Sequence, residues 1–491
     1  MNQSITQLGT PPARRATRTR TGLLSGLVAF WAQFRRRPYG MVGLIILILY
    51  AIMALAAPWL TPYKPDEMYL ADRLAAPVWA RYLPRFKGAP PTLRYTIGPG
   101  QWDLTRHENA SLTRATDQER GELTVVQLSP VLPGEAPATA ELSFPVHYPH
   151  NPPNTFDAKI TYAVEAPVDA QTTLSYSIID PQGTEYTVWD TTVYGSSDWN
   201  TATIDSRDFQ VKMKLGLSFF DDPATTVFAT KGDYRLVLRV SSTAASGPVR
   251  VRLAGLQANI LGLLHGLLGT DHVGSDLWTQ LVYGARISLI IGILAAIAAV
   301  AIGTVIGLIS GYLGGKIDEF FMRVADVFLS VPTLPILIIL SAFLGKHIGN
   351  IVLLVAAFSW MTTARVVRSQ TLSLKQRAFV EAARAAGAGN TYIMLTHLLP
   401  NVFPLVVANT VLMMPVAILY EAALSFLGLG DPRIPTWGRM LQNARAFGAF
   451  TELAWWWLVP PGLAITLLTL SFTLIGNAVN EVLNPRYRER T

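Results

Sequence analysis

Cysteine is absent from the 491 residues of this chain, and charged side chains are scarce. The missing cysteine excludes disulfide bonds, thiolate metal sites and a cysteine nucleophile. Charged residues make up 15% of the chain and hydrophobic residues 50%, which is the composition of a membrane protein with a soluble part. No phosphate-binding loop of the GxxxxGK(S/T) type occurs, because GYLGGK at 311–316 lacks its spacing. We therefore expect that this chain does not itself hydrolyse ATP.

A basic tail precedes the first apolar run. Residues 1–37 hold seven Arg and no acidic residue, and Met41–Trp59 is free of charge over 19 residues. Such a run can cross about 30 Å of hydrocarbon, and basic residues beside a span favour the cytoplasmic side over a role in nucleic-acid binding. A cleaved signal peptide is the alternative, since Ala-Leu-Ala at 54–56 resembles a cleavage site, but the long polar leader argues against it. We predict a cytoplasmic tail at 1–37 and an uncleaved transmembrane helix at 38–60.

Residues 61–262 contain no segment that could span a membrane. Polar and apolar residues alternate in AKITYAVE at 158–165, YRLVLRV at 234–240 and VRVRL at 249–253, as in half-buried strands. Asp-Pro-Gln-Gly at 180–183 separates two further runs and predicts a hairpin turn. We expect an extracytoplasmic β-sandwich, jelly-roll-like, of roughly 160 residues.

The purpose of this β unit has two interpretations. It is a folded spacer or a platform beside a delivering protein, or it is a carbohydrate-binding or substrate-capturing module. The second interpretation depends on four aromatic residues: Tyr186, Trp189, Tyr194 and Trp199. The first is favoured, because β-sandwiches use aromatic side chains in their own cores.

Residues 263–286 form an amphipathic stretch that we expect to lie as a helix on the outer surface. It contains His265, Asp271, His272 and Asp276. Two His and two Asp over so short a stretch do not have the spacing that closes a tetrahedral metal site. Capping and hydrogen-bonding roles are therefore predicted, and no metal site.

Five more apolar segments follow, so the chain is predicted to cross the membrane six times. These segments are 287–312, 327–344, 348–364, 402–427 and 453–479. With the basic amino terminus inside, six crossings return the carboxyl end to the cytoplasm as well. The predicted transport core is 287–480, with a cytoplasmic loop at 365–401 and a cytoplasmic tail at 481–491.

Ionisable residues are scarce within the apolar segments. Glu421 has apolar runs on both sides, and a carboxylate there is costly unless it faces protein or water. It is a candidate pathway or gate residue. The alternative is that it pins the outer loop through hydrogen bonds to Gly428, Gly430 or their neighbours. Asp326 is predicted to pair with Arg323.

The stretch FVEAARAAGAGNTYIMLTHLLP at 379–400 lies between two apolar segments, and basic residues precede it. Its alanines favour a short narrow helix, and Gly387 and Gly389 can end it in a left-handed cap. Thr391 should begin a second helix, which Pro400 stops before the next span. A helix with small side chains fits a docking element better than an active site.

The order Glu381-Ala382-Ala383, Gly387 and Leu399-Pro400 resembles the coupling loop of permease subunits in ATP-driven, binding-protein-dependent importers. The flanking stretches 269–289, 311–335 and 421–430 resemble the oligopeptide, dipeptide and nickel permease family. The resemblance covers 265–488 and a piece around the first span. It implies the type I ABC importer permease fold with six transmembrane helices.

Two features depart from that family's pattern. Its members usually have a much shorter connection where this chain has the β unit. The terminal motif at 476–486 carries Asn477, Asn480 and Asn484 where acidic residues often occur.

The resemblance implies a transport subunit rather than an enzyme. With a second permease it would form half of a translocation path for short peptides in the cell membrane. Two cytoplasmic ATPases, carrying ATP and Mg, would bind at 379–398, and an extracytoplasmic binding protein would deliver substrate. No cofactor is implied on this chain. Nickel chelates and oligosaccharides are alternative substrates.

The residues alone leave two other classes of protein as alternatives. A membrane-tethered binding or sensor protein would work through its β unit and have a dispensable helical core. A proton-coupled carrier would need more buried titratable groups than Glu421.

Overall fold

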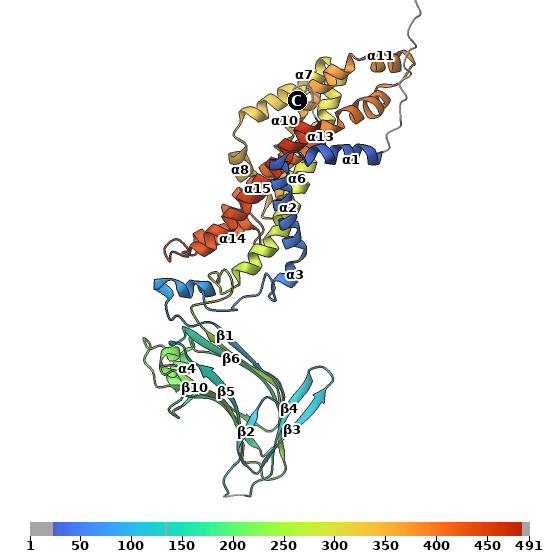
Figure 1. The fold of residues 1–491 in the computed structure, drawn as a ribbon. Helices are drawn as coiled ribbons and strands as arrows, with labels where there is room; N and C mark the ends of the chain where they lie inside the picture. The colour runs from blue at the N-terminus through green and yellow to red at the C-terminus, as the bar shows by residue number, and fades with distance from the viewer. Residues whose placement is uncertain (1–22, 133–134, 484–491) are drawn as a thin grey trace, which may run out of the picture.

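The computed structural model describes residues 23–132 and 135–483. Figure 1 shows an elongated molecule with a bundle of helices at one end and a β unit at the other. The connection between them contains α3 (Ala57–Leu60), η1 (Val78–Tyr82) and η2 (Pro84–Phe86). Most of the predicted tail at 1–37, most of the tail at 481–491 and Asn484 lie outside the described residues.

The β unit consists of two antiparallel sheets. One sheet has the order β3 (Ala110–Asp117), β4 (Gly121–Leu128), β11 (Val249–Leu261), β6 (Thr155–Glu165) and β9 (Ser197–Asp205), with β1 (Leu93–Ile97) also paired to β11. The other has the order β2 (Asp103–Glu108), β5 (Ala138–Tyr148), β10 (Gly232–Ser242), β7 (Gln171–Ile179) and β8 (Glu185–Tyr194). The short helices α4 (Phe209–Lys214) and α5 (Pro223–Val227) follow β9.

Alternation along the strands builds a shared core between the two sheets. Ile160 and Val164 of β6 and Leu236 and Leu238 of β10 are all buried in one cluster. The predicted hairpin at 180–183 is confirmed: Gly183 has φ +89° and joins β7 to β8. A separate β-sheet unit is therefore present, with two layers whose apolar faces meet.

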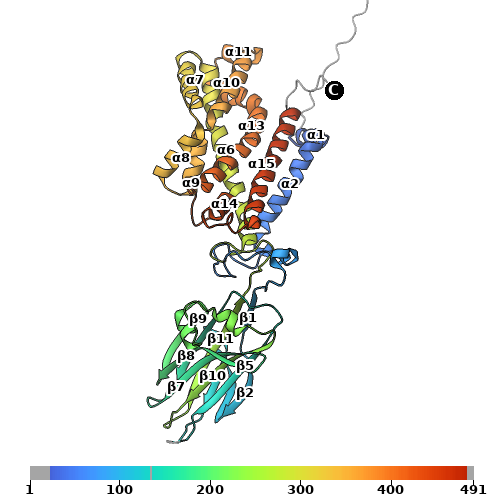
Figure 2. The same cartoon turned by 90° about the vertical axis from the view of Figure 1, so that its left-hand side faces the viewer.

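The helical unit is arranged around one long helix, α6 (Leu277–Leu313), as both Figure 1 and Figure 2 show. The other helices are α1 (Leu23–Phe34), α2 (Pro38–Leu55), α7 (Gly315–Ser330), α8 (Thr333–Leu344), α9 (Ile348–Ala357), α10 (Trp360–Lys375), α11 (Ala378–Ala385), α12 (Asn390–Tyr392), α13 (Leu399–Phe426), α14 (Trp437–Ala446) and α15 (Trp455–Leu483). In Figure 2, α7, α10 and α11 lie at the end of the bundle opposite the β unit, and α1 lies toward the same end.

Glycines at intervals of four residues let α6 approach α10 closely. A β-carbon at Gly303 would lie 2.5 Å from the carbonyl oxygen of Trp360, and one at Gly307 would lie 2.6 Å from that of Ala364. Such distances leave no room for a side chain. This is the small-residue packing that joins helices in lipid, where apolar contact alone gives no preference for a neighbouring helix.

Among the residues that the structure describes, five helical stretches are long and apolar enough to cross a membrane, and a sixth is obtained when α7 and α8 are taken as one broken span. The segment 327–344, predicted as one crossing, includes the break between α7 and α8, which meet at an angle of 91°. Val331 is extended (φ −96°, ψ 135°) and Pro332 follows it. The residue before a proline avoids the helical region, so α7 ends there.

The predicted outer helix at 263–286 is wrong. Residues up to Asp276 form loops and turns, and α6 then runs without a break from Leu277 into the span. Gly266, Gly269 and Gly274 have φ values of +51°, +74° and +75°, which interrupt any helix. Asp276 caps α6 by accepting a hydrogen bond from the backbone N–H of Thr279 at 2.7 Å.

Candidate functional site

The helix α11 contains the Glu-Ala-Ala sequence and ends in a closed cap. The backbone N–H of Gly387 donates to the carbonyl of Arg384 and that of Ala388 to the carbonyl of Ala383, each at 3.0 Å. Gly387 has φ +83°, so the pair of bonds forms a Schellman motif of the kind that glycine favours. The predicted left-handed cap is confirmed at Gly387. Gly389 is extended instead, with φ −69° and ψ 158°.

One apolar residue anchors α11 to the bundle. Val380 has 0% exposure and packs in a cluster with Tyr312 of α6, Val367 of α10 and Leu398. Its neighbours Glu381 and Ala382 are exposed, and Ala383 is half-buried. The helix therefore presents a small, exposed face outward while its other face contacts the elements that lead into the spans.

Tyr312, at the end of α6, holds both sides of the loop. Its hydroxyl lies 3.2 Å from Oδ1 of Asn390, to which it donates a hydrogen bond. Lys375 and Arg384 lie over its ring, 5.7 and 5.9 Å from the centroid, within the range of cation–π attraction. The sequence argument missed Tyr312 and Val380. Their apolar neighbours come from four separate elements, so no local pattern marks them.

Two arginines of α10 form ion pairs with α7. Arg368 makes a two-pronged contact with Asp318, with Nη2 2.6 Å from Oδ2. Arg365 pairs with Asp326. The predicted pairing of Asp326 with Arg323 is therefore wrong, because the guanidinium of a facing helix reaches the carboxylate. These contacts connect α7 to the helix that leads into α11.

Leu399 and Pro400 begin α13, and the helix does not stop there as predicted. Helical structure continues from Asn390 to Phe426 through a π-helical turn at Ile393–Leu398, labelled η3. Proline lacks the N–H of a helical bond, and its ring crowds the carbonyl one turn earlier. The wider π turn before Pro400 accommodates both effects, so a straight continuation replaces the predicted break.

Glu421 is buried in α13 beneath an outer loop, with 1% of its surface exposed. Its Oε1 accepts a hydrogen bond from Ser425 at 2.7 Å, and the side chain of Thr436 is a second partner. A β-carbon at Gly438 would lie 2.7 Å from the carbonyl oxygen of Ala422, so the start of α14 presses against α13 here. The carboxylate thus contacts the segment that crosses over α13, through Thr436 rather than through Gly428 or Gly430.

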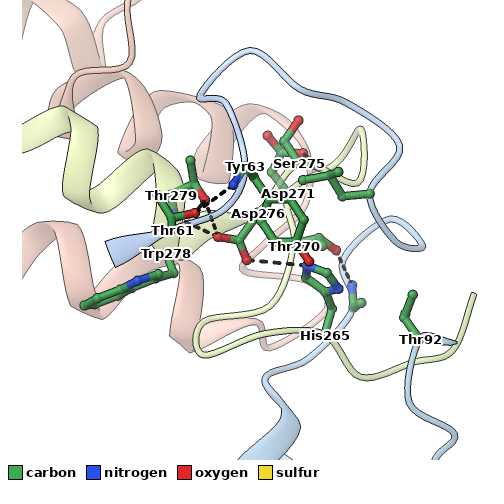
Figure 3. A network of polar contacts seen from close by, with 12 residues as sticks. Thr61, Tyr63, Thr92, His265, Thr270, Asp271, Ser275, Asp276, Trp278 and Thr279 are labelled. Atoms are coloured by element: carbon green, nitrogen blue, oxygen red, sulfur yellow. Dashed lines mark hydrogen bonds and ion pairs between the residues drawn. The ribbon is translucent and has the colours of Figure 1, made fainter. Parts of the chain in front are cut away.

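Two of the four His and Asp residues before α6, His265 and Asp276, belong to a network that joins the start of α6 to Thr61, which follows α3 (Figure 3). Asp276 accepts from both the N–H and the hydroxyl of Thr279 at 2.7 Å, and Thr279 contacts Thr61 at 2.5 Å. His265 lies 3.5 Å from Asp276. Within 23–132 and 135–483, no three His, Asp or Glu side chains are placed to hold a metal ion.

His272 and Asp271 belong to a second group of contacts. The ring of His272 stacks on Phe447 with 3.5 Å between centroids. Burial lowers the pKa of His272; Asp271 opposes this shift, while Arg439 and Arg73 add to it. The carboxylate of Asp271 accepts from the N–H groups of Val273 and Ser275 and from Gln280.

Comparison with known proteins identifies the family to which the helical unit belongs. The model of the family described as binding-protein-dependent transport system inner membrane component matches residues 303–489, and that of the N-terminal transmembrane domain of oligopeptide transport permease C matches 27–77. The oligopeptide transport system permease protein OppC of Haemophilus influenzae is 40% identical over 221 residues, which is 45% of this chain and 70% of that protein. This chain belongs to the binding-protein-dependent transport permease family.

A second curated relative agrees with this membership. The dipeptide transport system permease protein DppC of Alkalihalophilus pseudofirmus is 38% identical over 45% of this chain and 72% of its own length. The solved MetNI methionine ABC transporter, in inward-facing conformations, is 20% identical, with a TM-score of 0.33 over 41% of this chain and 96% of that one. From the family models and the curated relatives, the chain is a membrane-spanning transport permease and not an enzyme. The β unit lies between the two stretches that the family models match.

Proposed function

We propose that this permease is one subunit of an ATP-driven importer of short peptides in the cell membrane. A second permease completes the translocation path, two cytoplasmic ATPases carry ATP and Mg, and an extracytoplasmic binding protein delivers the peptide. The peptide permeases among its relatives support the substrate class. The geometry that carries the proposal is α11, a capped helix with an exposed small face and one buried anchor.

The proposed orientation has α11 in the cytoplasm. It is supported by α1 and the end of α15, which lie toward the same side of the bundle as α11 and would bring both ends of the chain to the cytoplasm (Figure 2). The β unit, at the opposite end of the molecule, is then extracytoplasmic. In this orientation residues 61–262 are extracytoplasmic and residues 365–401 are cytoplasmic.

Coupling operates through the anchor of α11. When ATP binding closes the ATPase pair, force on the face around Glu381 and Ala382 moves α11 as a unit. Val380 transmits this movement to α6 and α10, and Tyr312 transmits it to the start of the segment that leads into α13. The bundle then changes between two states whose equilibrium the nucleotide biases.

The β unit serves as a folded platform beside the binding protein. The rings proposed for carbohydrate capture are used elsewhere: Tyr186 and Trp189 pack against the β core. Trp199 lies beneath Arg120 and Arg252, 4.6 and 5.4 Å from its ring centroid. Only Tyr194 of the four has a largely free side chain, at 74% exposure. These observations favour the platform over a sensor acting through its β unit.

Charge reversal on α11 tests the proposal. Glu381→Lys, and Gly387→Asp at a positive φ, should leave the protein in the membrane and abolish peptide uptake by cells that depend on it. Glu319→Lys is the matched control, because Glu319 is exposed on α7 rather than on α11. Normal uptake by well-expressed α11 variants would exclude this helix as the coupling element.

A further inference from the structure

A cavity of about 460 Å³ opens where three outer loops meet. Its walls come from residues 65–68 after the first span, 271–280 before and at the start of α6, and 432–443 before and within α14. Small-molecule sites commonly have volumes of about 300–1,000 Å³. The cavity is therefore large enough for the end of a short peptide.

Arg439 lines this cavity without a partner for its charge. It lies half-buried in the first turn of α14, where its backbone N–H bonds to the capping hydroxyl of Thr436. Its guanidinium makes no hydrogen bond or ion pair within the described part of the chain. Arg433, which also lines the cavity, differs in that Asp431 pairs with it at 3.2 Å.

One acidic group of the cavity wall, Asp271, is already engaged. It accepts two backbone N–H bonds and one from the amide of Gln280 at 2.8 Å. Asp66 also lines the cavity, and Asp271 and Asp431 act on Arg439 as nearby charges. No carboxylate of the described residues bonds to the guanidinium of Arg439, so its N–H donors stay available to a ligand.

His272 also lines the cavity. Its Nδ1 has no hydrogen-bond partner among the described residues, but it is buried away from the open space. Its ring is fixed by stacking on Phe447. The guanidinium of Arg439 is therefore the group of the wall that suits a ligand with two oxygen atoms.

We propose that this cavity receives the carboxylate of a short peptide at its C-terminus, with Arg439 as the group that binds it. The inference rests on the proposed function as a peptide permease. The planar guanidinium forms paired hydrogen bonds with a carboxylate. Met68, Pro432 and Pro435 line other parts of the cavity and offer apolar contact to the last side chain of the peptide. An acidic side chain of the delivering protein carries the same chemistry and is distinguished by the test.

The absence of cysteine permits a direct test in the intact importer. Met68→Cys places one thiol in the cavity wall, where Met68 is 54% exposed, and Val168→Cys places one on the β unit, where Val168 is 98% exposed. Alkylation of each thiol by a maleimide is followed in the purified complex, without binding protein, in the presence of trialanine or trialanine amide. Trialanine at ten times its Kd should slow alkylation of M68C about tenfold by mass action. V168C should be unaffected.

The amide and the arginine variants identify the interaction. Trialanine amide should need a roughly tenfold or higher concentration for the same protection, because it lacks the charged carboxylate. Arg439→Gln should remove the difference in protection between trialanine and its amide. Arg439→Lys keeps the positive charge but lacks the paired N–H donors of a guanidinium, so it should reduce that difference. Arg445→Gln is the matched control: Arg445 lies on the same helix, outside the cavity and over the ring of Phe426.

Equal protection by acid and amide, no protection by either, or full discrimination in R439Q would overturn the inference. If M68C becomes protected only when binding protein is added without peptide, the carboxylate comes from that protein and the peptide site is excluded. Uptake of trialanine by cells with the unmodified chain is measured in parallel. Failure of that uptake would count against the proposed function, whereas normal uptake without protection would count against the cavity alone.

Discussion

Gly307 of α6 lies so close to Ala364 of α10 that a β-carbon on the glycine would be 2.6 Å from the alanine carbonyl oxygen. This contact belongs to the part of the bundle that connects α11 with the long central helix. A methyl group at that distance must push the two helices apart. The tight packing of α6 against α10 therefore depends on the absence of a side chain at this position.

Gly307→Ala is predicted to lower the free energy of unfolding by about 1–3 kcal/mol through overpacking. Gly462→Ala is the matched control, since nothing lies within 4 Å of a β-carbon there in α15. That change should be neutral or slightly stabilising, because alanine is the better helix former. Thermal unfolding of both variants in the same detergent measures the difference. Equal stability of the two would show that α6 and α10 can separate to admit a methyl group without loss of stability.

Glu421 is predicted to act as a hydrogen-bond acceptor that fastens the start of α14, not as a gating charge. Glu421→Gln keeps an oxygen for Ser425 and Thr436 and should retain both thermal stability and uptake. Glu421→Ala leaves the partner hydroxyl groups unsatisfied and should cost about 1–3 kcal/mol. Loss of uptake in the glutamine variant at unchanged stability would instead identify the negative charge as part of the pathway.

The stability of the outer loops is predicted to fall in acid because of His272. Burial lowers the pKa of His272 below the ordinary value of 6.5. The unfolded chain therefore takes up its proton at a higher pH than the folded chain does, and protonation favours unfolding. The contribution is full above about pH 6.5 and is lost as the pH falls below that value.

Thermal unfolding between pH 5 and 8 tests this sign. His272→Phe keeps a ring to stack on Phe447 and should flatten the pH dependence. His107→Phe, which changes an exposed histidine of β2, is the control for loss of an imidazole outside these loops. A slope that survives unchanged in H272F would assign the acid sensitivity to another group.

Local sequence signals predicted the elements whose structure is decided locally. Alternation in residues 234–240 gave a strand, and Gly387 after an alanine-rich run gave a helix cap. The bend at Val331 also has a local signal, because Pro332 follows it. An apolar composition predicts that a segment lies in lipid. It does not predict where the helix axis changes direction.

Contacts between distant residues explain the other differences. Asp326 pairs with Arg365 rather than with Arg323 because α10 packs beside α7, which no spacing within α7 could predict. Likewise Val380 became an anchor only through side chains of α6, α10 and the π turn. The cavity around Arg439 joins loops that are more than 150 residues apart in sequence, so only the folded chain brings its walls together.

Excision of the β unit is predicted to leave a functional bundle. Leu93 at the start of β1 pairs directly with Ile260 near the end of β11, so both ends of the unit lie side by side. Neighbouring strands are about 4.8 Å apart, which a linker of a few residues spans without strain. Joining residue 92 to residue 262 through such a linker should therefore keep the helices in place.

The excised permease should still insert, copurify with its ATPases and show ATP hydrolysis, while the separate unit 93–261 should be soluble and folded by circular dichroism. The platform role of the β unit predicts that stimulation by the binding protein falls while basal hydrolysis persists. A tethered sensor would behave in the opposite way, since its helical core would be dispensable and its activity would stay with 93–261. Retention of ligand-dependent activity by the isolated unit would therefore show that the β unit, and not the helical bundle, carries the function of this chain.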